Sequence, residues 1–269
     1  MKLLAAAGLA RVQSLRALRL QARSRVQLFG ARFIAFLLLF VASQTGAQVM
    51  MGSISMWNTN NMLNRQVMQI VNKPIFEKAE FDAGRRVSAS RLAARSDLAA
   101  TTTAFREQGE TAAEPPTRKL AQIYPGAKRA EAERVFVEML RGYRKIEQQF
   151  GIQRNDVAGA VAAFLVGSYM AYQNTAFPDA HVKPLVDQLG PIIARSPEFT
   201  KATNAERKDL YENMAILGMF MATTQMALQQ KPNAETSANM RTAAKAYLEQ
   251  FLKTDADRVQ ITAQGLVLR

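Results

Sequence analysis

The chain has 269 residues, 48% of them hydrophobic, which is enough for one sizeable domain with a core and flanking segments. Its net charge is +13, but residues 1–47 contribute +7 and no acid, so the rest of the chain is only mildly basic and lacks the dense Lys/Arg clusters of a nucleic-acid-binding protein. The absence of cysteine excludes disulfides, thiolate metal sites, a cysteine nucleophile and an acylated lipoprotein cysteine.

Residues 1–47 are typical of a secretory signal peptide. A basic region is followed by ten apolar residues, Phe33 to Ala42, and by small residues that place a cleavage site after Ala47. The apolar run is shorter than the roughly 20 residues that a membrane span needs, so we expect removal and no stable span afterwards. A mitochondrial transit peptide is the alternative, although such peptides do not normally end in a run of this kind. The expected location is exported, either periplasmic or extracellular.

The next two segments carry little helical or strand periodicity. Residues 48–81 are rich in Met and Asn, and residues 82–118 are rich in Ala, Ser, Thr and Arg with one aromatic residue, Phe105. The second composition predicts a flexible linker. Thioether sulfur suits Cu(I), but a copper site would usually have closer Met spacing or a histidine, so no metal is expected at the N-terminal methionines. They are Met50, Met51, Met56, Met62 and Met68.

Residues 119–269 are predicted to form a helical domain. A first amphipathic helix spans 127–150 and stops at Gly151. Residues 157–172 then form a helix without a single charge, which is typical either of a membrane span or of the centre of a bundle. Its length favours the bundle. Small residues at four-residue spacing would let a neighbouring helix approach closely; they are Gly159, Ala163, Gly167 and Ala171.

Three further helices and a short strand or hairpin complete the predicted domain. The first covers 181–195 and is interrupted or bent at Pro191. A capping box of Thr203 and Glu206 opens a long helix to about residue 229, whose second half is again uncharged. The last helix runs over 234–253, and alternating residues then predict a strand or hairpin that turns near Gly265. The expected fold is therefore all-α, a compact bundle of about five helices around two uncharged ones.

Few residue types for catalysis are present. His181 is the sole histidine and lies in a stretch that looks exposed, without a recognisable nucleophile motif nearby. Pairs of carboxylates remain possible, because glycoside cleavage needs only two acids held at a fixed separation. By placement the candidates are Glu138, Glu147, Asp156 and Glu212. Glu138 and Glu212 are the catalytic candidates, although helix solubility, capping and pairing with nearby basic residues account for such acids more simply. No cofactor is expected.

One stretch resembles a family of exported bacterial helical proteins classified only as a domain of unknown function. The resemblance lies in residues 132–147 (AERVFVEMLRGYRKIE), residues 155–164 (NDVAGAVAAF) and Gly167-Ser-Tyr169, and it would cover residues 119–269. It implies export and a helical domain, and it supplies no catalytic residues. Two functional hypotheses follow: a non-enzymatic module that binds an envelope partner, and an envelope hydrolase that cleaves glycans with a carboxylate pair.

Overall fold

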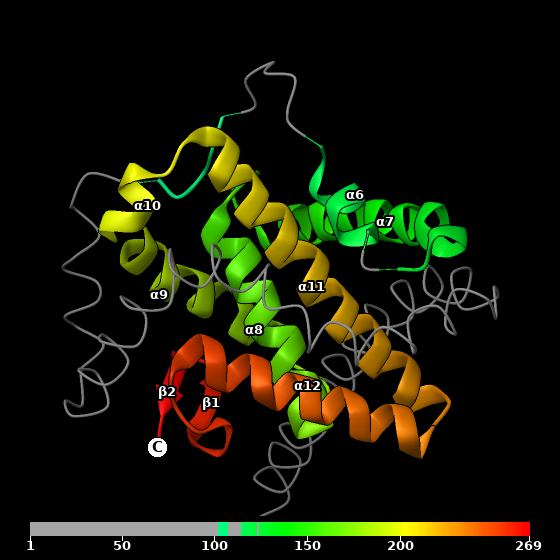
Figure 1. The fold of residues 1–269 in the computed structure, drawn as a ribbon. Coiled ribbons are helices and arrows are strands. Elements are labelled where there is room, and N and C mark those ends of the chain that lie inside the picture. The colour runs from blue at the N-terminus through cyan, green and yellow to red at the C-terminus, as the bar shows by residue number, and fades with distance from the viewer. Residues whose placement is uncertain (1–101, 107–113, 123) are drawn as a thin grey trace, which may run out of the picture. The chain divides into compact units, whose positions relative to one another are not determined.

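The computed structural model describes residues 102–106, 114–122 and 124–269. The expected signal peptide, the Met/Asn-rich segment and most of the expected linker lie outside these residues. Among the described residues there are seven α-helices, two short 3-10 helices and one two-stranded hairpin (Figure 1). The all-α prediction is confirmed.

The helices follow one another with short connections. They are α6 (Pro116–Ala121), α7 (Gly126–Phe150), α8 (Val157–Gln173), η1 (Asp179–His181), α9 (Val182–Ala194), α10 (Pro197–Lys201), α11 (Asn204–Gln230), α12 (Ala234–Leu252) and η2 (Ala256–Arg258). The hairpin consists of β1 (Val259–Thr262) and β2 (Gly265–Leu268), which pair antiparallel with Thr262 opposite Gly265.

Local sequence signals set the ends of the main helices. Gly151 adopts a left-handed conformation with φ of 61° and ends α7, as its sequence position predicts. The Asp156 side chain accepts a hydrogen bond from the Ala158 N–H and caps α8. Thr203 and Glu206 form the predicted capping box at the start of α11. Pro191 lies inside α9, where its ring removes one backbone hydrogen bond.

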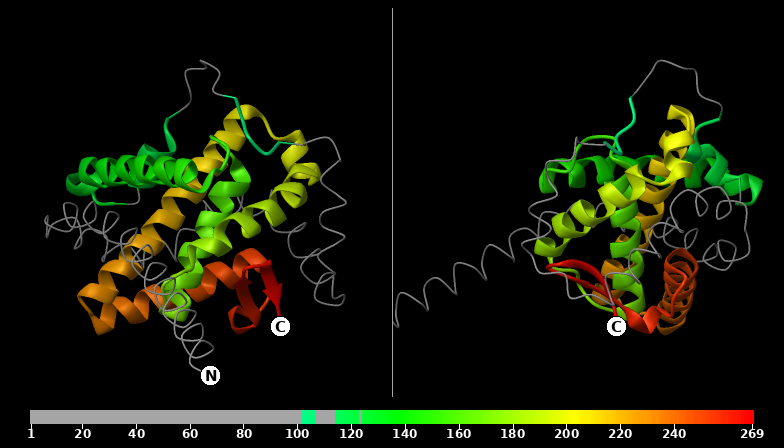
Figure 2. Two further views of the ribbon diagram at one scale, coloured as in Figure 1. Left: turned by 180° about the vertical axis from the view of Figure 1, so that it is seen from behind. Right: turned by 90° about the vertical axis from the view of Figure 1, so that its left-hand side faces the viewer.

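The two uncharged helices form the centre of the domain, as predicted. α8 packs most extensively on α11, and it also contacts α12 and α9 (Figures 1 and 2). Their backbones meet at glycines: a Cβ added at Gly167 would lie 2.3 Å from the carbonyl oxygen of Gly218, and one added at Gly218 would lie 2.5 Å from the carbonyl of Ala163. The small-residue stripe therefore serves close helix packing.

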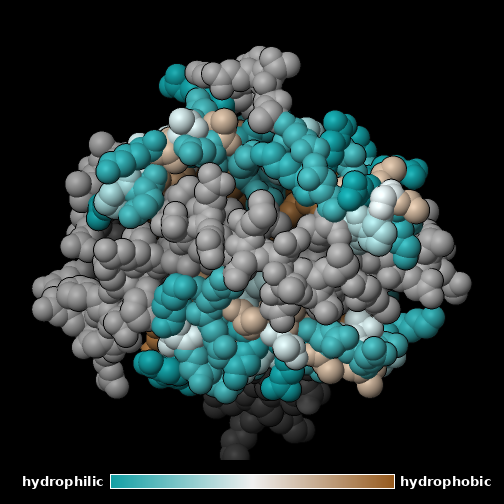
Figure 3. Space-filling model, in the orientation of Figure 1, coloured by the Kyte–Doolittle hydropathy of each residue, from teal (hydrophilic) through white to brown (hydrophobic). Residues whose placement is uncertain are grey.

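α7 packs on one helix of this central pair, and the hairpin packs on α9. α7 contacts α11 and α6, while α9 contacts β2. On the face seen in Figure 3 the described surface is mainly hydrophilic, with scattered apolar residues. Among the described residues, no helix combines the length and apolar character that crossing a membrane requires.

Candidate functional site

A buried polar cluster lies where α7, the turn before α8 and α11 meet. We call it the polar cluster and define it as Tyr143, Glu147, Asn155, Asp156 and Tyr211. Tyr143 and Tyr211 have no exposed surface, Glu147 is 2% exposed and Asn155 is 8% exposed. Polar side chains are rarely buried to this degree without a structural or chemical reason, so this cluster is the candidate site.

Helix spacing and two sharp turns bring these residues together. Tyr143 and Glu147 are four residues apart and therefore share one face of α7. Gly151 and Asn155 both have a positive φ of 61°, so the chain reverses tightly before α8. From α11, the Tyr211 ring meets the Tyr143 ring edge to face, with 5.6 Å between the ring centroids.

Gly159 provides the room for Tyr143. A Cβ at residue 159 would lie 2.9 Å from the Tyr143 hydroxyl oxygen and 2.6 Å from a methyl carbon of Ile152. A side chain at this position would thus displace the tyrosine from the first turn of α8. The sequence places this glycine in the small-residue stripe, but its neighbours are the side chains of Ile152 and Tyr143 and not the backbone of another helix.

Burial shifts the protonation equilibria of the cluster. Loss of solvent raises the pKa of Glu147 to about 7, and this effect outweighs the influence of the Tyr211 side chain, the Asn155 backbone and Arg144, which favour the charged form. Burial also raises the pKa of Asp156, although the Thr103 hydroxyl and two backbone N–H groups act in the opposite direction. The negative charge of Asp156 raises the pKa of Glu147 further. The protonation of Glu147 therefore responds to the charge of Asp156 as well as to burial.

Several buried atoms of the cluster make no hydrogen bond of good geometry with the residues that the structure describes. These atoms are the Tyr143 and Tyr211 hydroxyls, Glu147 Oε1, Asn155 Oδ1 and the neighbouring Arg144 Nε. An unsatisfied buried polar group costs roughly 1 to 3 kcal/mol. Five of these atoms therefore lie together in one region of the described core.

A short extended segment covers the cluster. Residues 102–106, which we call the strap, run antiparallel to the turn before α8, with a β-bridge between Ala104 and Asp156. The Phe105 N–H donates to the Asn155 carbonyl oxygen at 3.2 Å, and the Val157 N–H donates to the Thr103 carbonyl oxygen at 3.3 Å.

Side chains of the strap add to this attachment. The Thr103 hydroxyl donates to the Asp156 carboxylate, and the Phe105 ring packs edge-on against Tyr211 at 5.3 Å. Phe105 is only 6% exposed. The strap and α6, which begins at Pro116, both lie within the segment 82–118 that its composition predicts to be a flexible linker, and both carry buried side chains. Residues 82–101 and 107–113 lie outside the described part.

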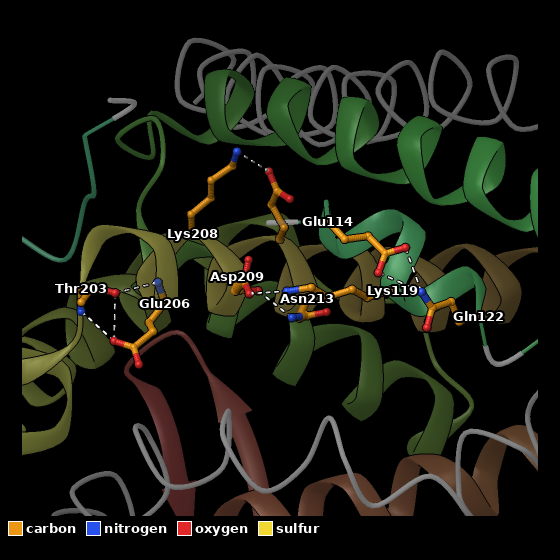
Figure 4. Close-up of polar contacts among 9 residues, drawn as sticks. Glu114, Lys119, Gln122, Thr203, Glu206, Lys208, Asp209 and Asn213 are labelled. Carbon is orange, nitrogen blue, oxygen red and sulfur yellow. Dashed lines mark hydrogen bonds and ion pairs between the residues drawn. The ribbon is translucent and has the colours of Figure 1, made fainter. Parts of the chain in front are cut away.

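The two catalytic candidates occupy different settings. Glu138 is on the exposed side of α7 and forms an ion pair with Arg141. Glu212 on α11 has a side chain only 8% exposed, 4.0 Å from the Lys208 ammonium. Figure 4 shows Lys208 on α11, near the capping box and near the contact between Lys119 of α6 and Asp209. The two carboxyl groups of the polar cluster, Glu147 and Asp156, are the other two acids that the sequence offered as candidates by placement.

The remaining candidates are distributed elsewhere. His181 ends η1 and is half-buried rather than exposed, with its ring edge against Phe177 at a centroid distance of 5.8 Å. Within the described ranges, no three His, Cys, Asp or Glu side chains are grouped so that they could hold a metal ion. The N-terminal methionines lie outside those ranges.

Sequence reasoning missed the tyrosines and the strap. Tyr143 fits the apolar face of α7, and Tyr211 precedes the uncharged half of α11, so both are indistinguishable from ordinary core residues. One signal was available for the strap: Phe105 is the lone aromatic residue in a polar, Ala-rich segment.

Comparison with known proteins gives one match. No curated protein and no solved structure matches the chain. A family model described as a family of unknown function (DUF6683) matches residues 30–269, which confirms the resemblance to a domain of unknown function and extends it toward the N-terminus. The match covers most of the chain, and the protein therefore belongs to this family of unknown function.

Proposed function

We propose that the protein is exported and acts as a non-enzymatic helical module that binds a partner in the bacterial cell envelope. One observation carries the choice of binding over hydrolysis: the Glu147 carboxylate is enclosed, only 2% exposed beneath packed tyrosines, while Asp156 is half-buried. A glycan-cleaving pair must flank the scissile bond on opposite sides, which requires both acids to face an open site. Glu138 and Glu212 are instead each engaged by a basic residue of their own helix.

Export is supported by the sequence of residues 1–47. The basic region, the apolar run and the small residues before Gln48 follow the order of a cleavable signal peptide. N-terminal sequencing of protein recovered from the periplasm or medium of an expressing bacterium should begin at Gln48. Recovery of intact chain from the membrane or cytosol would contradict export.

A second function has one observation in its favour. Glu147, with a pKa of about 7, lies beside a second carboxyl group, and a general acid with such a pKa would be protonated in part at neutral pH. This pair would replace Glu138 and Glu212 as the acids of an envelope hydrolase. Catalysis by this pair would require the strap and the two tyrosines to move aside, so that a glycan could reach both acids.

Incubation with purified peptidoglycan sacculi separates the two functions. Unchanged sacculi after prolonged incubation, at pH 5 and at pH 8, would support a module without catalysis. Release of soluble glycan fragments that is abolished in Glu147→Gln, or in Glu138→Gln or Glu212→Gln, would overturn it. Far-UV circular dichroism of each variant must match that of the parent, so that lost activity reports chemistry rather than unfolding.

A further inference from the structure

The strap joins the two groups that flank Glu147. On one side its backbone pairs with the turn at Asn155 and Val157, and on the other its Phe105 ring packs on Tyr211. Asn155 and Tyr211 are also the groups whose polar atoms influence Glu147 most strongly after burial itself. Removal of the strap would therefore loosen both neighbours of this carboxyl group and admit water to it.

Hydration would relieve the unsatisfied polar atoms of the cluster. Two buried side chains carry an atom without a partner among the described residues, at the Tyr143 hydroxyl and Asn155 Oδ1, and the contact between Glu147 and Tyr211 falls short of good hydrogen-bond geometry. While the strap is attached these atoms stay dry, and when it leaves, water can bond to them. The attachment is itself small, with two backbone hydrogen bonds, one hydroxyl bond and one buried ring. A few contacts thus favour the closed state, and hydration of these polar atoms favours the open state.

We propose that the strap is a pH-controlled latch, which is closed while Glu147 is protonated and is released when Glu147 becomes charged. Charging places an anion in a dry site beside a second carboxyl group, Asp156, which itself anchors the strap through Thr103. This inference does not depend on export or on the binding role, because it concerns only contacts within the chain.

Ionisable groups from three elements act on this site. Glu147 experiences Tyr143 and Arg144 from its own helix, Asp156 from the turn and Tyr211 from α11. Asp156 additionally experiences Asp187 of α9. Arg144 is the one cation in this set, and burial outweighs it: the pKa of Glu147 is about 7 rather than 4.5. The latch should therefore respond between pH 5 and 8.

Hydrogen exchange of the full chain tests the latch directly. The reporters are the Phe105 and Val157 amides, which form the two strap hydrogen bonds. After correction for the intrinsic pH dependence of exchange, their protection should fall by about tenfold or more from pH 5 to pH 8. In Glu147→Gln, which keeps a neutral side chain of the same shape, protection should stay high at both pH values. Equal pH dependence in the parent and the variant, or none in the parent, would overturn the proposal.

A second measurement does not require Glu147→Gln to fold. If the strap keeps Glu147 dry, then Phe105→Ala should lower the pKa of Glu147 toward its ordinary value, as followed by the carboxyl carbon resonance during a pH titration. Phe177→Ala removes an aromatic contact next to His181 instead, and it serves as the matched control, expected to leave the titration unchanged. An unaltered Glu147 titration in Phe105→Ala would show that the strap does not control this group.

Discussion

Gly167 is the residue at which the two central helices leave least room. The carbonyl oxygen of Gly218 occupies the position where a side chain would begin, and backbone atoms cannot move aside as flexible side chains do. We expect Gly167→Ala to destabilise the protein by about 1 to 3 kcal/mol, and Gly167→Leu to destabilise it more, because α8 and α11 must separate. Chemical denaturation monitored by circular dichroism measures both effects.

Gly126 is the matched control for this prediction. It also lies in a helix, at the start of α7, but a Cβ there would meet no atom within 4 Å. Gly126→Ala should therefore raise stability by up to about 1 kcal/mol, because alanine has the better helix propensity and restricts the unfolded chain. If both alanine substitutions changed the stability in the same direction, the close helix approach at Gly167 would not be the cause of the destabilisation.

Glu147 makes stability depend on pH with a defined sign. Its pKa is raised from 4.5 to about 7 in the folded protein, so the folded state holds this proton more tightly than the unfolded state does. The resulting stabilisation is complete below pH 4.5 and is lost as the pH rises through about 7, with a total change of about 1 to 3 kcal/mol. Burial of Asp156 raises its pKa too and acts in the same direction.

Urea denaturation at a series of pH values measures this loss. Glu147→Gln should flatten the decline between pH 5 and 8, whereas Glu138→Gln, at an exposed and ion-paired position, should leave it in place. A decline of equal size in parent and Glu147→Gln would assign the pH dependence to other groups.

At the scale of elements, one side chain of α9 secures the C-terminal hairpin. Gln188 accepts a hydrogen bond from the Leu266 N–H at 2.7 Å and donates one to the Leu266 carbonyl oxygen at 3.0 Å. It thereby occupies the edge of β2 as a third strand would. Gly265 makes this possible, since its φ is 99° and a Cβ there would lie 2.5 Å from the Gln188 oxygen.

Loss of this side chain should weaken the hairpin. Gln188→Ala leaves both backbone groups of buried Leu266 unpartnered, so we expect a cost of about 1 to 3 kcal/mol and faster exchange of the Leu266 amide. Gln260→Ala, a half-buried position on β1, should change stability by less than about 0.5 kcal/mol. Similar effects from both would mean that the hairpin is held by apolar packing alone.

For the molecule as a whole, α8 is the central helix. Truncating one of its buried side chains should lower the stability of the other elements together. Leu165 has no exposed surface, and its helix contacts α9, α11 and α12. Leu165→Ala should cost about 2 to 5 kcal/mol, and the slowest-exchanging amides of α7, α11 and the hairpin should all exchange faster to the same extent. Val166→Ala, at a half-buried position, is the control and should cost less than about 1.5 kcal/mol. Unequal losses among these elements would show that they do not unfold as one cooperative unit.

The sequence by itself determined the helical elements, because the signals that define their ends and faces are local in the chain. The uncharged stretches, the capping residues Asp156 and Thr203, and the stop at Gly151 act within a few residues of the ends that they define. The small residues of α8 also predicted a close helix neighbour, and the structure identifies it as α11 through Gly218.

Only the tertiary structure shows which residues form the site and that the strap is ordered. A sequence period shows that Tyr143, Glu147 and Tyr211 lie in helices, but not that α7 and α11 turn these side chains toward one another. The pKa of Glu147 follows from desolvation by residues that are distant in the chain. The strap, likewise, is polar by composition and is ordered by its bonds to a turn about 50 residues away. Composition measures how much apolar surface a segment offers, whereas its order depends on the partners that the fold places beside it.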